Sequence, residues 1–316
     1  MRKLITVALL VAGIAAIAAL PAAARPGGTN GKIVVNVDNS VTGQEQVYTV
    51  NPDGTDMQLL ANDAEAGQWS PDGTKIAMFS GYLNFDTGDF TDLGLPFDRY
   101  PDLALFCGVW SPDGARLACE GGFVDPTLQG VYTVRSSDGG DLQQITSDPF
   151  GDDCPSDYSP NGKQLVVTVS PPDAPQALFT VKVNGTGRRQ ITPSGMFVDF
   201  CSASWSPQGN EIVFSAHVPN ADRSTIWVVH SDGSDLREIP VPGCGGPRSS
   251  PASIGCQKPV WSPDGRQIMF ERHFLIPNDH FELYTVSADG SGLFQVTNTP
   301  NLDEAGGDWG AHPLTP

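Results

Sequence analysis

The chain has 316 residues, of which 36 are acidic and 18 are Lys or Arg, so its formal net charge at pH 7 is −18. Such an acidic surface argues against nucleic acids and anionic membranes as partners, because both are negatively charged. The sequence contains no phosphate-binding loop, dinucleotide fingerprint or G-x-S-x-G nucleophile motif, which argues against those enzyme classes.

The N-terminus has the three parts of a secretory signal peptide. Arg2 and Lys3 precede an apolar run from Leu4 to Leu20, and small residues follow at 22–24. We predict that residues 1–24 are a signal peptide and residues 25–31 a flexible leader; an uncleaved anchor is the alternative. Cleavage would leave 16 basic and 36 acidic residues, a net charge of −20. The sequence therefore predicts a secreted or periplasmic protein of the bacterial envelope, not inserted in a membrane after cleavage.

A repeated pentad, Trp-Ser-Pro-Asp-Gly, organises the rest of the chain. Its Pro presets φ at the first turn position, Asp or Asn tolerates the second, and Gly supplies a left-handed residue. Each copy thus predicts a strand, a three-residue loop and a second strand. The second strand is an apolar run such as Ile76–Phe79, typical of a strand covered on both faces. Pentads or close variants begin at Trp69, Trp110, Tyr158, Trp205 and Trp261.

A second hairpin is predicted after each pentad. Its turn is Asp-Gly or Asn-Gly between alternating strands, the strongest short-range hairpin signal. In the irregular copy after Phe79, we place the turn at Asp86–Gly88. The regular turns lie at 53–54, 138–139, 184–185, 232–233 and 289–290. Two hairpins give four antiparallel strands, the unit of one propeller blade.

The two ends of the repeat array complement each other. The segment from Lys32 to Val35 resembles the second strand of a pentad hairpin without a first, and the segment around Trp309 resembles a first strand without a second. We predict that the C-terminal strand pairs with the strand from Ile33 and closes residues 32–316 into one all-β, six-bladed β-propeller. The aromatic residues expected to pack between its blades, here called anchors, are Trp69, Trp110, Tyr158, Trp205, Trp261 and Trp309.

Six cysteines in an exported chain predict disulfides rather than metal ligands. Two pairs of cysteines, each twelve residues apart, flank a hairpin or a loop; the other two cysteines lie at equivalent positions, four residues before Tyr158 and Trp205. Among the fifteen possible connectivities we predict the pairs Cys107–Cys119, Cys154–Cys201 and Cys244–Cys256.

The loops of variable length are predicted on one rim of the ring, and the regular turns on the other. We call these the variable rim and the turn rim. Function tends to reside on variable loops that a rigid scaffold holds. The variable rim is therefore where we expect a binding site.

The pentads and hairpins resemble the TolB-type, WD-like propeller repeats of exported bacterial proteins, over about residues 32–310. The resemblance implies protein–protein contact in the bacterial envelope, with the propeller as the docking platform. TolB proteins also carry a preceding α/β domain, for which residues 25–32 leave no room. The resemblance is therefore to the propeller alone.

Two histidines could carry chemistry. His217 and His273 each follow their anchor by twelve residues, so we expect them at equal heights in adjacent blades on the variable rim. Two imidazoles could bind a transition metal or act as acid and base. Propeller lyases that act on uronic acids are similar in using rim histidines and a metal. The alternative is that both are polar loop residues.

Acidic residues gather in the loops that join blades. With the histidines they form the predicted ligand-binding rim: Asp152, Asp153, Asp157, Asp199, His217, His273, Asp303 and Glu304. Carboxylates just before the anchors should approach the mouth of the central channel, where they could hold Ca²⁺. The calcium candidates are Glu65, Asp157, Glu304 and Asp308. The alternative is that these acids are solvated loop residues.

We predict a monomeric, exported propeller that requires no cofactor, catalyses no reaction and binds an envelope or extracellular protein or glycan through its variable rim. The alternative hypothesis is a metal-assisted polysaccharide lyase or hydrolase that uses His217, His273 and the channel-mouth carboxylates.

Overall fold

The computed structural model describes residues 28–39, 42–149, 151–218, 221, 223–246, 254–274, 280–299 and 302–312; at 96, 97 and 305 only the backbone is described. The predicted signal peptide, residues 1–24, lies outside the described residues.

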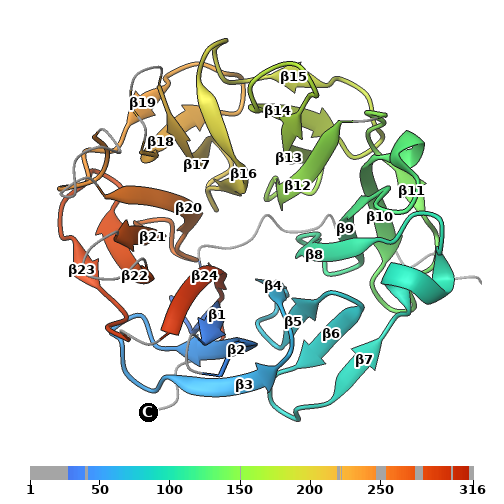
Figure 1. Ribbon diagram of the computed structural model, residues 1–316, viewed down its shortest axis with the longest axis horizontal. Coiled ribbons are helices and arrows are strands. Elements are labelled where there is room, and N and C mark those ends of the chain that lie inside the picture. The colour runs from blue at the N-terminus through green and yellow to red at the C-terminus, as the bar shows by residue number, and fades with distance from the viewer. Residues whose placement is uncertain are drawn as a thin grey trace, which may run out of the picture.

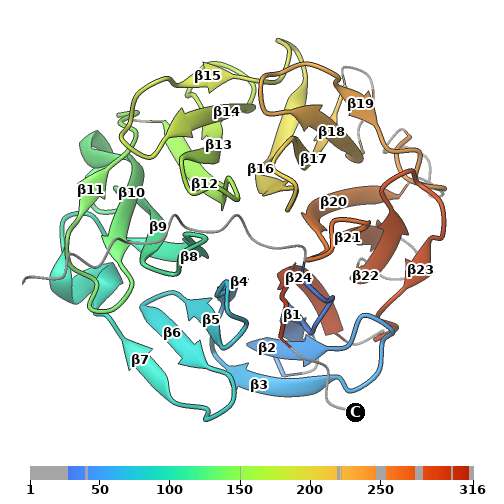
Figure 2. The ribbon, with the colours of Figure 1, turned by 180° about the vertical axis from the view of Figure 1, so that it is seen from behind.

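Six four-stranded antiparallel sheets surround a central axis as the blades of a propeller (Figures 1 and 2). The described helical segments are one π-helical turn, Leu95–Arg99, and one 3-10 turn, Pro126–Leu128. The predicted all-β, six-bladed fold is therefore confirmed.

The strands of each blade run from the channel outward. Blades 1 and 2 comprise β24 (Leu302–Trp309), β1 (Ile33–Asn39), β2 (Gln44–Val50) and β3 (Gln58–Asn62), then β4 (Ala66–Trp69), β5 (Lys75–Met78), β6 (Gly81–Asn84) and β7 (Phe90–Asp92). Blades 3 and 4 comprise β8 (Phe106–Trp110), β9 (Arg116–Gly121), β10 (Gly130–Arg135) and β11 (Gln143–Gln144), then β12 (Asp152–Tyr158), β13 (Gln164–Ser170), β14 (Ala177–Lys182) and β15 (Arg189–Gln190). Blades 5 and 6 comprise β16 (Phe197–Trp205), β17 (Glu211–His217), β18 (Thr225–His230) and β19 (Arg237–Glu238), then β20 (Gly255–Trp261), β21 (Gln267–Phe274), β22 (His280–Ser287) and β23 (Phe294–Gln295).

Blade 1 closes the ring. Its innermost strand, β24, pairs antiparallel with β1, so that Trp309 lies opposite Ile33 and Asp308 opposite Val34. Figure 1 shows the red C-terminal strand beside the blue N-terminal strands. The predicted closure is confirmed, and it gives both terminal strands a hydrogen-bonded neighbour.

The pentad loop is one residue longer than predicted. In blade 3 the Ser111 N–H donates to the Arg116 carbonyl at 2.9 Å, which leaves four loop residues rather than three. The buried Ser111 hydroxyl donates to Asp113 Oδ1 at 2.6 Å and accepts from the Arg116 N–H at 2.9 Å. The serine therefore satisfies groups that the tight turn would otherwise leave without a partner.

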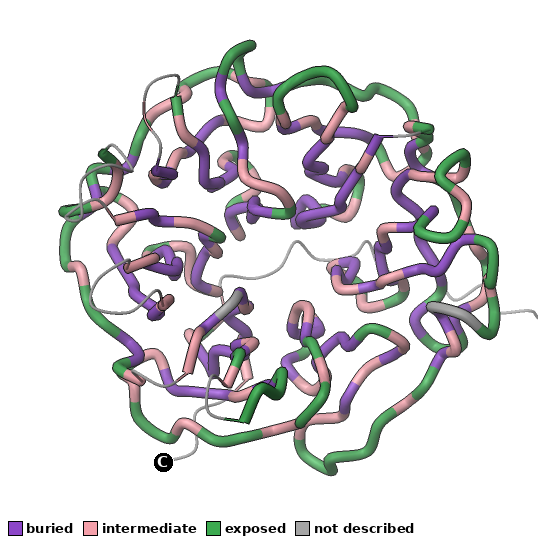
Figure 3. Tube along the Cα trace, in the orientation of Figure 1, coloured by how far each residue is buried: buried purple, intermediate pink, exposed green. Residues whose placement is uncertain are grey.

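The anchors pack between blades, as predicted. The described core consists of six apolar clusters, each formed by two neighbouring blades. Trp110, for example, lies in a cluster with Ala77 of blade 2, and Trp309 lies with Met269 of blade 6. Figure 3 shows buried residues mainly in the inner part of the blades and exposed residues mainly on the loops and the outer edge. Because these interfaces are buried and closely packed, the ring is rigid and holds the rim loops in place.

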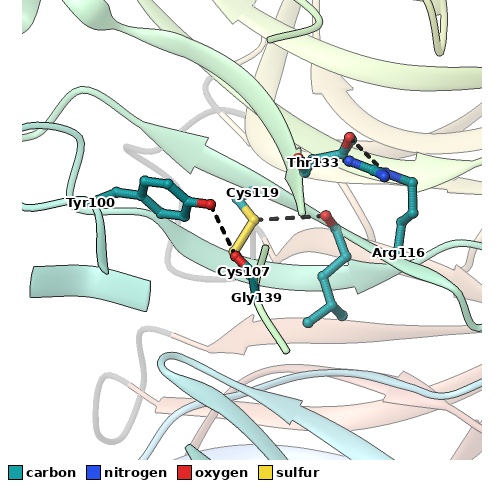
Figure 4. The surroundings of a disulfide bond; sticks show 7 residues. Tyr100, Cys107, Arg116, Cys119, Thr133 and Gly139 are labelled. Atoms are coloured by element: carbon teal, nitrogen blue, oxygen red, sulfur yellow. Dashed lines mark hydrogen bonds between the residues drawn. A yellow bond between two sulfur atoms is a disulfide. The ribbon is translucent and has the colours of Figure 1, made fainter. Parts of the chain in front are cut away.

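All three predicted disulfides are present. Cys107–Cys119 joins two strands of blade 3 and lies near Tyr100, whose hydroxyl donates to the Gly139 carbonyl at 3.1 Å (Figure 4). Cys154–Cys201 joins the innermost strands of blades 4 and 5.

Candidate functional site

The two predicted histidines are stacked on phenylalanines. His217 lies parallel to Phe197, its partner on the neighbouring strand, with ring centroids 4.9 Å apart and planes 3° apart. His273 stacks on Phe281 at 4.2 Å and 11°. The histidines occupy equivalent positions in β17 and β21, as predicted. Both imidazole rings therefore pack against a phenylalanine. Among the described residues, neither histidine belongs to a group of side chains that could hold a metal ion.

Two groups of potential metal ligands do occur among the described residues. The first joins Glu120 to Cys154 and Cys201, but both sulfurs belong to a disulfide and are not thiolate ligands. The second joins Glu211, His230 and Asp235 on the turn-rim side of blade 5.

The second group is already bound by a guanidinium. Arg237 lies 2.6 Å from Glu211 Oε1 and 3.1 Å from Asp235 Oδ2. A metal ion would have to displace this cation, so the group is better described as a surface ion-pair network.

Two of the calcium candidates hold blades together. Asp157 Oδ2 accepts a hydrogen bond from the Trp205 N–H at 2.8 Å, and Asp308 Oδ2 accepts one from the Trp69 N–H at 2.8 Å. Both carboxylates are buried. Each therefore stabilises the contact between the innermost strands of adjacent blades.

Glu304 lies at the seam between blades 6 and 1. It is buried, and the Thr299 hydroxyl donates to its Oε1. The Thr299 N–H donates to Oε1 of Glu282, also buried, at 2.8 Å. Burial, together with the nearby charge of Glu282, raises the pKa of Glu304 to about 8. Glu304 is therefore placed to carry a proton near neutral pH.

The central channel has a polar wall. A cavity of about 220 Å³ is lined by residues of all six blades, including Asn36, Gln68, Ser156 and Lys258. Glu65 also lines it; desolvation of its carboxyl, with smaller contributions from the charges of Glu45 and Asp38, raises the pKa of this group although part of its side chain is exposed. The calcium candidates therefore do not all lie around one cavity, because Glu65 and Asp308 line this one and Glu304 does not.

Other rim acids fix loops and strands. Asp199 accepts hydrogen bonds from the Ser215 hydroxyl at 2.6 Å and the Ser224 hydroxyl at 2.8 Å. Asp303 Oδ1 accepts one from the Phe281 N–H at 2.7 Å. These contacts orient the ends of strands on the variable rim.

An exposed row of aromatic rings on the variable rim was not predicted. Phe79 and Phe106 meet edge to face with centroids 5.0 Å apart, and Phe106 and Phe123 do so at 4.7 Å. Phe79, Phe123 and the adjacent Val124 are 41%, 50% and 56% exposed. We call Phe79, Phe106, Phe123 and Val124 the aromatic ridge.

The ridge corrects one prediction. Phe79 was assigned to a strand covered on both faces, but β5 ends at Met78 and the Phe79 side chain extends to solvent. The signal that could have revealed the ridge is Phe123-Val124, an apolar pair within a variable loop.

Acidic residues lie beside the ridge. Glu120 is the register partner of Phe106, and its carboxyl faces Asp152 and Asp153 of blade 4. Burial, a hydrogen bond with Asp152 and the charges of Asp152 and Asp153 raise the pKa of Glu120 to about 9. We call Glu120, Asp152 and Asp153 the acidic cluster.

Solved structures show where this architecture recurs. TolB from Acinetobacter baumannii superposes with a TM-score of 0.68 at 17% identity, covering 90% of this chain and 67% of that one. A protein assigned as TolB from Agrobacterium tumefaciens gives 0.61 at 18% identity, covering 90% and 94%. The chain has a TolB-like propeller fold. No protein-family model matches it, and no curated protein matches its sequence.

The TolB-like propeller also resembles an enzyme in fold. An oligogalacturonate lyase in complex with manganese superposes with a TM-score of 0.55 at 14% identity, covering 88% of this chain and 76% of that one. At this identity the likeness concerns the fold alone. In this TolB-like propeller Asp157 and Asp303 bind groups of the neighbouring blade, whereas Phe79 and Phe123 of the aromatic ridge are exposed to solvent.

Proposed function

We propose that this chain is an exported, non-catalytic scaffold that binds a protein partner through its variable rim. The aromatic ridge is the observation that carries the proposal. Exposed apolar side chains that touch one another on the rim of a rigid fold favour association with another surface. The implied docking role of TolB-type repeats is consistent with this use of the rim.

The energetics of the ridge suit a binding hot spot. Full burial of one Phe side chain stabilises by about 1.5–3 kcal/mol relative to exposure. Phe79 and Phe123 are each about half exposed, and their edge-to-face contacts with Phe106 hold the rings in place before a partner arrives. Little side-chain freedom would then be lost on binding.

Export is supported by the cysteines. All six lie in disulfides, which persist in oxidising compartments and are rare in the cytosol. Among the residues that the structure describes, no helix is both long and apolar enough to cross a bilayer.

A peptide selection tests the proposal. Random peptides displayed on phage are selected on the wild-type protein, and their dissociation constants are measured on Phe79→Ser and Phe123→Ser. Controls are Phe90→Ser and Phe294→Ser, because these phenylalanines are 49% and 45% exposed but lie on the outermost strands β7 and β23. We expect a loss of about tenfold or more for the ridge variants and less than twofold for the controls.

Two outcomes would overturn the proposal. One is that every selected peptide binds the ridge variants as tightly as the wild type. The other is that no peptide binds, while oligosaccharides on a glycan array bind in a manner that Phe123→Ser abolishes. The second outcome would assign the ridge to a glycan instead.

A further inference from the structure

We infer that the partner segment presents a Lys or Arg side chain on the same face as its apolar anchor, and that this cation binds the acidic cluster while the anchor covers the aromatic ridge. This inference rests on the proposed function, since it describes the partner of the same surface.

The ridge and the cluster are contiguous. Phe106 on β8 and Glu120 on β9 are directly opposed, and opposed residues of antiparallel strands have Cβ atoms about 5 Å apart. Phe123 follows Glu120 by only three residues. An extended segment that covers the ridge can therefore reach the carboxyl of Glu120 with the side chain two positions from its anchor, because residues i and i+2 of an extended chain lie on the same face.

The charges around Glu120 are unevenly neutralised. Arg188 lies 3.5 Å from Asp148 Oδ2 and 3.6 Å from Asp153 Oδ1, so it pairs with these two acids. Among the described ion pairs, none involves Glu120 or Asp152. Both of these side chains are partly buried, and both retain some exposure from which a cation could approach.

In the free protein, a proton on Glu120 reduces the unpaired negative charge of the acidic cluster. Asp152 and Asp153 are the charged groups that act on Glu120, Arg188 and Asp148 in turn act on Asp153, and the neighbouring Cys154–Cys201 disulfide does not titrate. Because burial and Asp152 raise its pKa, Glu120 is protonated at neutral pH. An incoming ammonium or guanidinium would stabilise the ionised carboxylate, so the proton would leave to the buffer.

Proton release gives the inference a specific signature. Two synthetic peptides are compared by calorimetry at pH 7 in buffers of different ionisation enthalpy. Both carry the apolar anchor found by selection; two positions from the anchor, one has Lys and the other has the uncharged norleucine. For the wild type we expect release of close to one proton with the Lys peptide and none with the norleucine peptide. We also expect the Lys peptide to bind on the order of tenfold more tightly.

Two variants provide the controls. Glu120→Gln keeps the shape and neutrality of the protonated acid, so it should fold normally but lose the proton release and the preference for Lys. Glu65→Gln removes another carboxyl of raised pKa, on the channel wall, and should change neither. Thermal melts of both variants check folding.

The outcomes separate the two proposals. Equal binding of the Lys and norleucine peptides, with both lost in Phe123→Ser, would overturn this inference and leave the protein-binding function standing. Lys preference retained in Glu120→Gln would also overturn it. Binding that is independent of Phe123 would overturn the proposed function itself.

Discussion

The carboxylate of Asp308 accepts a hydrogen bond at 2.8 Å from the backbone N–H of Trp69, a residue 239 positions earlier in the chain. The same relationship links Asp157 to Trp205, and Ser204 Oγ accepts from the Trp261 N–H at 3.3 Å. In each case the residue before one anchor binds the anchor of the next blade. These hydrogen bonds join the innermost strands of adjacent blades around the channel, and we call each of them a latch.

Removal of a latch should destabilise the ring. Asp308→Ala leaves the buried Trp69 N–H without its acceptor, which we expect to lower the free energy of unfolding by about 1–3 kcal/mol. Asp157→Ala should behave in the same way at blades 4 and 5. Urea unfolding measures both. Ser204→Ala removes a longer, uncharged bond and should cost less; an Asp308→Ala protein as stable as wild type would contradict the role of the latch.

The seam between blades 6 and 1 should weaken as pH rises. The carboxyl of Glu304 ordinarily has a pKa of 4.5, and in the folded protein its pKa is raised to about 8. Between these values the folded state binds more protons than the unfolded state, so this group's contribution to stability declines as pH increases from about 4.5 to about 8.

Glu304→Gln tests this pH dependence. The amide cannot ionise, so thermal melts from pH 5 to pH 9 should show a smaller loss of stability for the variant than for wild type. Glu282→Gln should have a partial effect, because the charge of Glu282 contributes to the raised pKa of Glu304. Parallel melting curves for wild type and Glu304→Gln over this range would contradict the assignment.

The disulfides should differ in their contribution to stability. Cys154–Cys201 closes a loop of 47 residues and Cys107–Cys119 one of 12. In the loop-entropy description, loss of the first costs about 4 kcal/mol and loss of the second about 3 kcal/mol. Paired Cys→Ser variants, unfolded in denaturant, measure the difference. Greater destabilisation from loss of Cys107–Cys119 would show that strain or local packing outweighs loop closure.

The repeat pattern predicted the ring because each pentad and hairpin encodes its own turn. It also predicted the Cys107–Cys119 pair, although it assumed a three-residue loop. The actual loop is longer by one residue, and a bulge between Cys107 and Val109 restores the register, so the two differences cancel.

The repeat pattern could not predict features that depend on contacts with neighbouring blades or loops. Glu304 was expected at the channel mouth, but a bulge in β24 opposite Val35–Val37 changes the alternation of its side chains, and Glu304 is buried at the seam. Phe79 looked like a core residue because periodicity cannot show whether an adjacent loop covers a strand end. The ridge follows from loop geometry, which hydrophobic patterning alone does not encode.

Hydrogen exchange of the protein with and without a selected Lys-containing peptide tests the central claim most directly. We predict slower exchange of backbone amides at residues 77–80, 104–108 and 119–125, which carry the ridge and Glu120, with no change in the turn-rim segments 70–74, 159–163 and 262–266. Protection confined to the turn rim or to the outermost strands, with the ridge segments unchanged, would contradict docking on the variable rim.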